Sequence, residues 1–334
     1  MPNTIQTNKS PHTSWISVAF FLLITIAGCS DNQPSLQGDR DIKADTINVL
    51  ATTGMVADLI RKVGGSQVDV TQLMGSGVDP HLYKPNRDDI QSILDSDIVF
   101  YSGYHLEGKM TSTLNQLASQ KRVIAIAEHI NEDQLIQDQQ GQVDPHLWMD
   151  IELWSKLLPP IAEELIKVSP DHATEFRDNA LEAVDELQQL HKFGIDAIST
   201  IPESKRVLIT SHDAFQYFGR AYQIEVAGIQ GLSTESEAGL QRINELVDMI
   251  ASRQISAIFV ESSVPAKNID SLIEGASARS HQVEIGGELY SDAMGDVSSE
   301  QGTYIGMMAH NLKTVVQSLG GTVEPFLPDD PSTK

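Results

Sequence analysis

The chain has 334 residues, and its 46 acidic side chains outnumber its 23 basic ones, which gives a formal net charge of −23. Because proteins bind nucleic-acid phosphates through basic patches, this balance excludes nucleic acid as the expected ligand. The single cysteine excludes an internal disulfide, so a buried core must stabilise the fold. The length is sufficient for two domains of ordinary size.

The N-terminus has the pattern of an export signal. Residues 18–27 form a nearly unbroken apolar run, which is too short to span a bilayer but is typical of a signal-peptide core. The sequence Ile26-Ala27-Gly28-Cys29 resembles the lipobox of bacterial lipoproteins, which implies cleavage before Cys29 and a lipid anchor on it. We therefore expect a signal peptide at 1–28 and an exported, membrane-anchored protein that faces the periplasm or the cell exterior. An ordinary cleaved signal followed by a chance cysteine is the alternative.

The first half of the mature chain alternates between strand and helix patterns. Residues 29–46 are polar and without an apolar cluster, as expected of a flexible tether. Strands are expected at 47–51, 68–73, 98–101 and 123–127. Helices are expected between them, at 55–63, at 87–94 and once more before the last strand. This alternation predicts a parallel sheet covered by helices, in an N-terminal lobe at 47–168.

One long helix is predicted in the middle of the chain, over about 171–198 within a linking segment at 169–200. Its apolar residues recur at three- and four-residue steps, which predicts one buried stripe: Phe176, Ala180, Ala183, Leu187 and Leu190. Because so long a helix exceeds the needs of one small domain, we interpret it as a spine between two lobes. Gly194 is expected to be a soft point in it.

The alternation resumes after this helix. Strands are expected at 206–210, 225–227, 257–261 and 282–285, and the clearest helices at 240–253 and 303–319. These elements predict a C-terminal lobe at 201–322, followed by a loose tail at 323–334. The predicted fold class is therefore α/β, with two lobes that each contain a mostly parallel sheet flanked by helices, joined by one long spine helix.

The tetrapeptide Asp-Pro-His-Leu occurs twice, at 79–82 and at 144–147. Proline restricts its own backbone and that of the preceding residue, so His81 and His146 each project from a stiff turn. Histidine is the commonest metal ligand among side chains. His212 and Asp292 also follow predicted strands, where ligands of open α/β sheets gather. Three imidazoles and one carboxylate form a four-coordinate set for one divalent ion, Zn²⁺ or Mn²⁺.

A single histidine is more often a surface or hydrogen-bonded core residue than a ligand, whereas four candidates at strand ends favour a metal. His105 is the best spare histidine, and we expect it to cap or pack a helix start. Glu261, at the end of an apolar strand, is a candidate acceptor for the second nitrogen of a ligand imidazole. An ordinary strand-end acid that bonds the backbone is the equal alternative.

The same segments resemble the TroA-like zinc and manganese receptors of ABC transporters. The matching motifs lie at 77–83, 103–108, 144–150, 211–215, 258–263 and 286–292. The resemblance implies two α/β lobes bridged by one helix, metal ligands at His81, His146, His212 and Asp292, and a membrane permease with its ATPase as partner. It also implies a monomer that carries the ion in the interlobe cleft as cargo.

The sequence leaves the identity of the metal and two other functions open. His212 stands where many manganese-type receptors have glutamate, which favours zinc, but residues 131–143 lack the histidines of many zinc-type receptors. A zinc hydrolase or hydratase is the main rival, although four protein ligands would close the site to substrate and no His-Glu-x-x-His occurs. A surface adhesin is the third reading. We expect a receptor and not an enzyme.

Overall fold

The computed structural model describes residues 46–327. The expected signal peptide, the expected lipid-bearing Cys29, nearly all of the tether and the end of the tail lie outside these residues. Within the described part of the chain, no helix combines the length and the hydrophobicity that crossing a bilayer requires.

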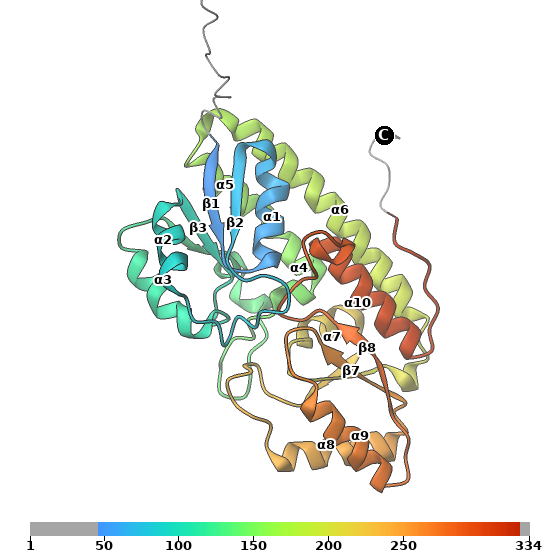
Figure 1. The fold of residues 1–334 in the computed structure, drawn as a ribbon. Coiled ribbons are helices and arrows are strands. Elements are labelled where there is room, and N and C mark those ends of the chain that lie inside the picture. Colours follow the sequence, from blue (N-terminus) through green and yellow to red (C-terminus); the bar gives the residue numbers. More distant parts are fainter. Residues whose placement is uncertain (1–45, 328–334) are drawn as a thin grey trace, which may run out of the picture. The chain divides into compact units, whose positions relative to one another are not determined.

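The first lobe contains a four-stranded parallel sheet in the order β2-β1-β3-β4 (Figure 1). The strands are β1 (Ile47–Ala51), β2 (Val68–Gln72), β3 (Ile98–Tyr101) and β4 (Val123–Ala125). The intervening helices are α1 (Gly54–Gly64), α2 (Arg87–Asp95) and α3 (Thr111–Leu117). Asn86 caps α2 by accepting from two backbone amides of its first turn, which explains where this helix begins. The predicted α/β order of this half is confirmed.

Two helices that the sequence analysis did not predict follow the second Asp-Pro-His-Leu segment. They are α4 (Ile151–Ser155) and α5 (Leu158–Ile166). Pro159 and Pro160 fall in the first turn of α5. Backbone amides in the first turn make no hydrogen bond within the helix, so the missing N–H groups of the prolines cost none. The prolines therefore begin a helix here instead of interrupting one.

The predicted spine is α6 (Ala173–Ser199), preceded by a 3-10 turn at Pro170–His172. All five residues of its predicted apolar stripe are buried. The helix packs against α1, α4 and α5 on the first lobe and against α7 and α10 on the second (Figure 1). The helix continues through Gly194 without interruption, and this residue packs against the Tyr222 ring, while the expected softness at Gly194 stays a prediction.

The second lobe contains two parallel strand pairs. Strand β5 (Val207–Thr210) pairs with β6 (Glu225–Gly228), and β7 (Ala257–Glu261) pairs with β8 (Glu284–Leu289). The helices are α7 (Gln216–Tyr222), α8 (Leu240–Arg253), α9 (Lys267–Ala278) and α10 (Tyr304–Ser318). Strand β8 runs four residues beyond its predicted end at 285. The register shifts opposite Ile258 and Phe259, so the glycine pair forms a bulge inside the strand.

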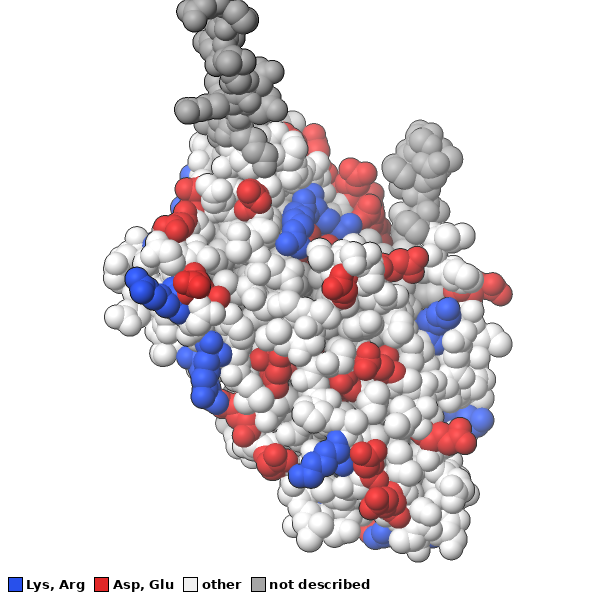
Figure 2. Space-filling model, viewed as in Figure 1, with Lys and Arg blue, Asp and Glu red and all other residues white. Residues whose placement is uncertain are grey.

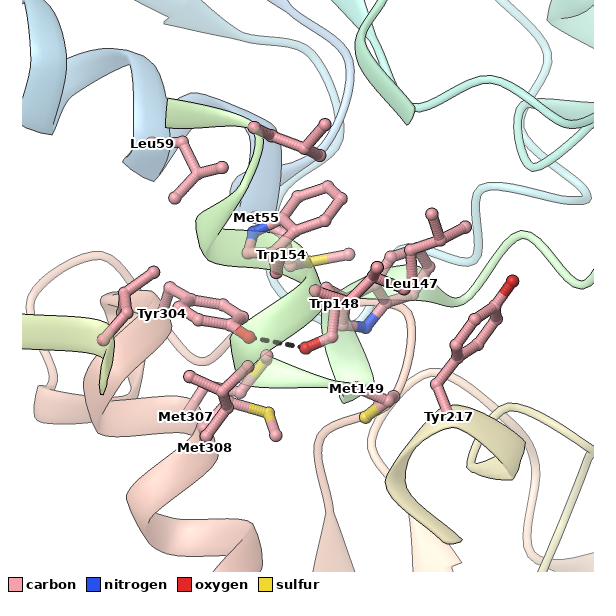
Figure 3. Close-up of a cluster of buried hydrophobic side chains, with 14 of the residues drawn as sticks. Met55, Leu59, Leu147, Trp148, Met149, Trp154, Tyr217, Tyr304, Met307 and Met308 are labelled. Atoms are coloured by element: carbon pink, nitrogen blue, oxygen red, sulfur yellow. Dashed lines mark hydrogen bonds between the residues drawn. The ribbon is translucent and has the colours of Figure 1, made fainter. Parts of the chain in front are cut away.

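The largest hydrophobic core extends across both lobes. Figure 3 shows Met55 and Leu59 of α1 near Trp148 and Trp154, with Tyr304, Met307 and Met308 of α10 on the other side. The Tyr304 hydroxyl donates a hydrogen bond of 2.6 Å to the Trp148 carbonyl oxygen at full burial. Phe326, within the expected tail, contacts Phe193 of α6. The lobes therefore share one core beneath their common boundary.

On the face shown in Figure 2, acidic and basic side chains are mixed and do not form separate patches. Asp and Glu are dispersed over this face, and Lys and Arg are interspersed among them. Salt bridges join exposed groups of opposite charge among the described residues, such as Arg253 with Glu225 and Arg177 with Glu163. Such a surface favours solubility and offers no continuous basic patch on this side.

Candidate metal centre

Both Asp-Pro-His-Leu segments form the same local turn. In the first, Asp79 Oδ1 accepts a hydrogen bond of 2.9 Å from the His81 backbone amide. In the second, Asp144 Oδ1 accepts an identical 2.9 Å bond from the His146 amide. Proline stiffens the residue between each pair, and the aspartate closes the turn around it. Each turn therefore presents its imidazole in a restricted direction.

His212 follows β5 after one further residue, Ser211. The His212 amide donates to Glu261 Oε1 over 2.9 Å, and the His212 carbonyl accepts from the Thr210 hydroxyl over 2.8 Å. The chain passes so close to Gly228 that a Cβ there would lie 2.5 Å from the Asp213 amide nitrogen. Strand β7 thus fixes the backbone of a ligand candidate that follows β5.

Asp292 follows β8 after two further residues. The carbonyl of the preceding Ser291 accepts a 2.9 Å hydrogen bond from Trp148 Nε1, although the two residues belong to different lobes. This bond anchors the Asp292 loop to the shared core. The fourth candidate is therefore positioned by tertiary contact and not by its own strand alone.

The four candidates converge on one point. Their metal-binding atoms all lie within 4.8 Å of one another. Asp292 Oδ2 lies 3.1 Å from His212 Nε2 and 3.5 Å from His81 Nε2, Asp292 Oδ1 lies 3.5 Å from His146 Nε2, and the Nε2 atoms of His81 and His146 are 3.4 Å apart. Ligands 2.0–2.1 Å from a tetrahedral ion would be about 3.3 Å apart. The spacing therefore fits one first-row divalent ion.

These atoms are buried, and several lack hydrogen bonds. The four side chains are at most 2% exposed. Both carboxylate oxygens of Asp292 and Nε2 of His212 are buried without a hydrogen bond of acceptable geometry among the described residues. Because leaving such groups unpaired in a protein interior is costly, their convergence indicates a site built for a cation.

Two of the three imidazoles are oriented by carboxylates on their far side. His212 Nδ1 lies 2.5 Å from Glu261 Oε2, and His146 Nδ1 lies 2.7 Å from Asp144 Oδ1. Each carboxylate accepts a hydrogen bond from the Nδ1–H group, which leaves Nε2 directed at the common point. Nδ1 of His81 makes no such bond to any residue within 46–327. Its imidazole is therefore less firmly held.

Burial and mutual charge shift the titration of this cluster. Burial lowers the pKa of His81 to about 3, and the other two imidazoles act in the same direction, whereas Asp292 opposes the shift. Burial also opposes charge on His212, but Asp292 and Glu261 outweigh it and raise the His212 pKa well above its ordinary value. Although burial alone would raise the Asp292 pKa, the imidazoles hold it below its usual range. A bound cation would compete with the proton that the raised pKa keeps on His212.

His105 lies outside the metal centre, whereas Glu261 contacts one of its ligand candidates. His105 is exposed, with a backbone φ of 64°, and does not belong to the converging cluster. Glu261 contacts both the amide and the imidazole of His212. The sequence analysis missed Asp144 as the partner of His146. Its signal was present in the repeated tetrapeptide, whose aspartate was interpreted only as the residue before proline.

This chain is similar to known metal-binding proteins over nearly its whole described length. The family model "Zinc-uptake complex component A periplasmic" matches residues 49–318. The manganese-binding lipoprotein MntA of Bacillus subtilis is 44% identical over 305 residues, which cover 91% of this chain and 98% of that protein.

A zinc-binding protein and its solved structure give the second comparison. The zinc-binding protein TroA of Treponema pallidum is 41% identical over 283 residues, covering 84% of this chain and 92% of that protein. The structure of periplasmic TroA matches with a TM-score of 0.80 and covers 82% of this chain and 99% of that one. The metal ABC transporter substrate-binding lipoprotein SsaB of Streptococcus sanguinis is 27% identical, with 90% of this chain and 98% of that protein covered. The predicted two-lobed fold with a long spine helix is confirmed by the structural match.

Proposed function

Because the chain belongs to the family of periplasmic zinc-uptake component A proteins, we propose that it captures one divalent transition-metal ion and delivers it to an ABC permease for import. The observation that carries this proposal is the convergence of His81, His146, His212 and Asp292, all buried and with several ligand atoms unpaired. Two of these residues come from each lobe. The ion would therefore be held at the boundary between the lobes as cargo.

The ligand set supports both zinc and manganese as cargo. Three imidazole nitrogens suit zinc, whereas manganese prefers more oxygen ligands. Asp292 presents one oxygen toward His146 and the other toward His81 and His212, and neither oxygen has a hydrogen bond of acceptable geometry within residues 46–327. The carboxylate can thus offer one oxygen to a four-coordinate ion or both to a five-coordinate ion. Relatives named for manganese and for zinc are similarly close, which agrees with this dual capacity.

Export and membrane attachment complete the proposal. The lipobox-like sequence before Cys29 lies outside the described residues, and relatives such as MntA and SsaB are named lipoproteins. We infer that Cys29 carries a lipid anchor and that the folded part faces the periplasm or the cell exterior as a monomer. The family name and the transporter named with SsaB support a permease and its ATPase as partners.

A competitive titration of metal-stripped protein with Zn²⁺ and Mn²⁺ tests the proposal. We expect one tight site per chain that accepts either ion, with zinc the tighter because of the general affinity order of first-row ions. The absence of stoichiometric binding by both ions would overturn it. Incubating the zinc-loaded protein with esters, peptides and carbon dioxide checks the hydrolase alternative, because a receptor turns over none of them.

A further inference from the structure

The two copies of Asp-Pro-His-Leu use their aspartates differently. In the second copy, Asp144 Oδ1 holds both the amide and the imidazole Nδ1 of His146. In the first copy, Asp79 Oδ1 holds only the amide of His81, and no carboxylate within residues 46–327 accepts a hydrogen bond from Nδ1 of the His81 imidazole. His81 is therefore the one ligand imidazole whose orientation depends on its turn alone.

The second oxygen of Asp79 reaches the other lobe. Asp79 Oδ2 accepts a hydrogen bond of 2.5 Å from the Thr234 hydroxyl, in the segment that connects β6 to α8. Thr234 is only 9% exposed, and the bond is partly buried. One carboxylate thus joins the His81 amide on one side to the Thr234 hydroxyl on the other. A movement of Thr234 would be transmitted to His81 through this group.

A second contact joins the same two regions. Glu235, the residue after Thr234, lies 3.6 Å from the ammonium group of Lys109. Lys109 follows Gly108, which packs directly against the backbone of His81. A Cβ atom at Gly108 would lie only 2.3 Å from the His81 carbonyl oxygen. Both charged side chains are 44% exposed, so this pair contributes little energy by itself. The ion pair nevertheless places the 233–236 segment beside the His81 turn.

A cavity adjoins the segment that carries Thr234. This cavity of about 520 Å³ lies between the segment and the 138–142 loop, and its walls include Ser233, Ser236, Asp213 and Arg242. Residues 233–236 therefore border open space and have room to move. The Asp79–Thr234 bond opposes this movement.

From these contacts we propose that Thr234, acting through Asp79, is a positioning residue that holds His81 over the ion and thereby sets the rate of metal release. The inference rests on the proposed function, since it concerns the same site. Breaking the bond frees the His81 turn while leaving His146, His212 and Asp292 with their own supports. The first ligand to leave the ion is then His81, on the side that faces the 233–236 segment.

Zinc release from the loaded full-length protein into excess chelator, followed by stopped flow, tests this. Thr234→Val and Thr234→Ala both remove the hydroxyl, and we expect each to accelerate release about tenfold, the effect of losing one hydrogen bond to a carboxylate. Thr234→Ser keeps the hydroxyl and should release zinc at nearly the native rate. Ser236→Ala is the matched control, because it removes an exposed hydroxyl from the same segment.

A double variant tests whether Thr234 acts through His81. Adding Thr234→Val to His81→Ala should change the release rate less than twofold, since the residue through which it acts is gone. A native release rate in both hydroxyl-free variants would overturn the inference, as would full acceleration in the His81→Ala background. If the native protein itself binds no zinc, the proposed function fails and the inference with it. If the native protein binds zinc and only the variants behave unexpectedly, the proposed function stands.

Discussion

The imidazoles at His81 and His146 arise from identical tetrapeptides yet have different surroundings. Both turns are closed by the same aspartate-to-amide hydrogen bond. Only at His146 does this aspartate also reach the ring, because the side-chain direction there brings Nδ1 within 2.7 Å of Asp144. Local sequence determined the turn, and the tertiary environment determined the role of the carboxylate.

Replacing a ligand candidate should weaken metal binding far more than replacing the spare histidine. We expect His81→Ala to lower zinc affinity by at least about a hundredfold, since one of four coordination bonds is lost. His105→Ala should change the affinity less than about twofold, because His105 is exposed and outside the cluster. Isothermal titration of both metal-stripped variants measures the difference. Equal losses would show that the ligand assignment is wrong.

Neutralising an outer carboxylate should also weaken binding, but less. Glu261→Gln removes the acceptor that orients His212, and Asp144→Asn removes that of His146. We expect each to lower zinc affinity about 10- to 100-fold, the usual effect of removing such a partner. Glu284→Gln makes the same chemical change at an exposed position of β8 and serves as the control. Unchanged affinity in Glu261→Gln and Asp144→Asn would remove these carboxylates from the site.

At the level of elements, packing between helices explains a residue of α6 that intrinsic helix preference disfavours. Glycine is an unfavourable helix residue, which is why the sequence predicted a soft point at Gly194. In the structure, a Cβ at this position would lie 2.7 Å from Cε1 of Tyr222, a ring that is itself almost fully buried. Gly194 therefore allows α6 and α7 to approach closely.

We expect Gly194→Ala to destabilise the protein. The overlap with the Tyr222 ring should cost about 1–3 kcal/mol and outweigh the gain in helix preference, which is on the order of 1 kcal/mol. Chemical denaturation followed by circular dichroism measures the change in unfolding free energy. Gln188→Ala, on the exposed face of the same helix, should stay within about 0.5 kcal/mol of the native protein. A stabilised Gly194→Ala variant would support the view of Gly194 as a weak point.

At the level of the whole molecule, buried groups connect helices that are distant in sequence. Asp58 of α1 accepts a hydrogen bond of 3.2 Å from the Tyr304 amide at the start of α10. Burial raises the pKa of Asp58 above its ordinary value of 3.8, although Lys62 and the Tyr304 bond act in the opposite direction. A carboxyl whose pKa is raised in the folded state binds its proton more tightly there than in the unfolded state. Its ionisation therefore opposes folding.

This shift predicts a pH-dependent effect of Asp58→Asn. The contribution of Asp58 to stability is fully present below its ordinary pKa and is lost as the pH rises through the folded-state pKa. The stability of Asp58→Asn relative to the native protein should thus increase between about pH 4 and the folded-state pKa and remain constant above it. Thermal unfolding of both metal-free proteins from about pH 4 to pH 8 checks this. A difference that falls with rising pH would contradict the direction of the shift.

The sequence alone determined the order of the strands, the spine helix and the four ligand candidates. These follow from local chemistry: residue periodicity predicts strands and helices, proline stiffens the two histidine turns, and the ends of parallel strands bring their loops to one edge. Strand β8 was predicted too short because its glycine pair has a low strand preference, and only pairing with β7 keeps these residues in the strand.

Only the tertiary structure decided how the ligand candidates are held and which imidazole has no carboxylate at its Nδ1 among the described residues. Asp144 and Glu261 orient His146 and His212, while Asp79 binds Thr234, more than 150 residues away in the chain. Such pairings depend on how the lobes pack and on the directions of individual side chains. Local periodicity predicts neither the packing of the lobes nor these side-chain directions. Most of these contacts join segments that are far apart in the sequence and meet only in the folded chain.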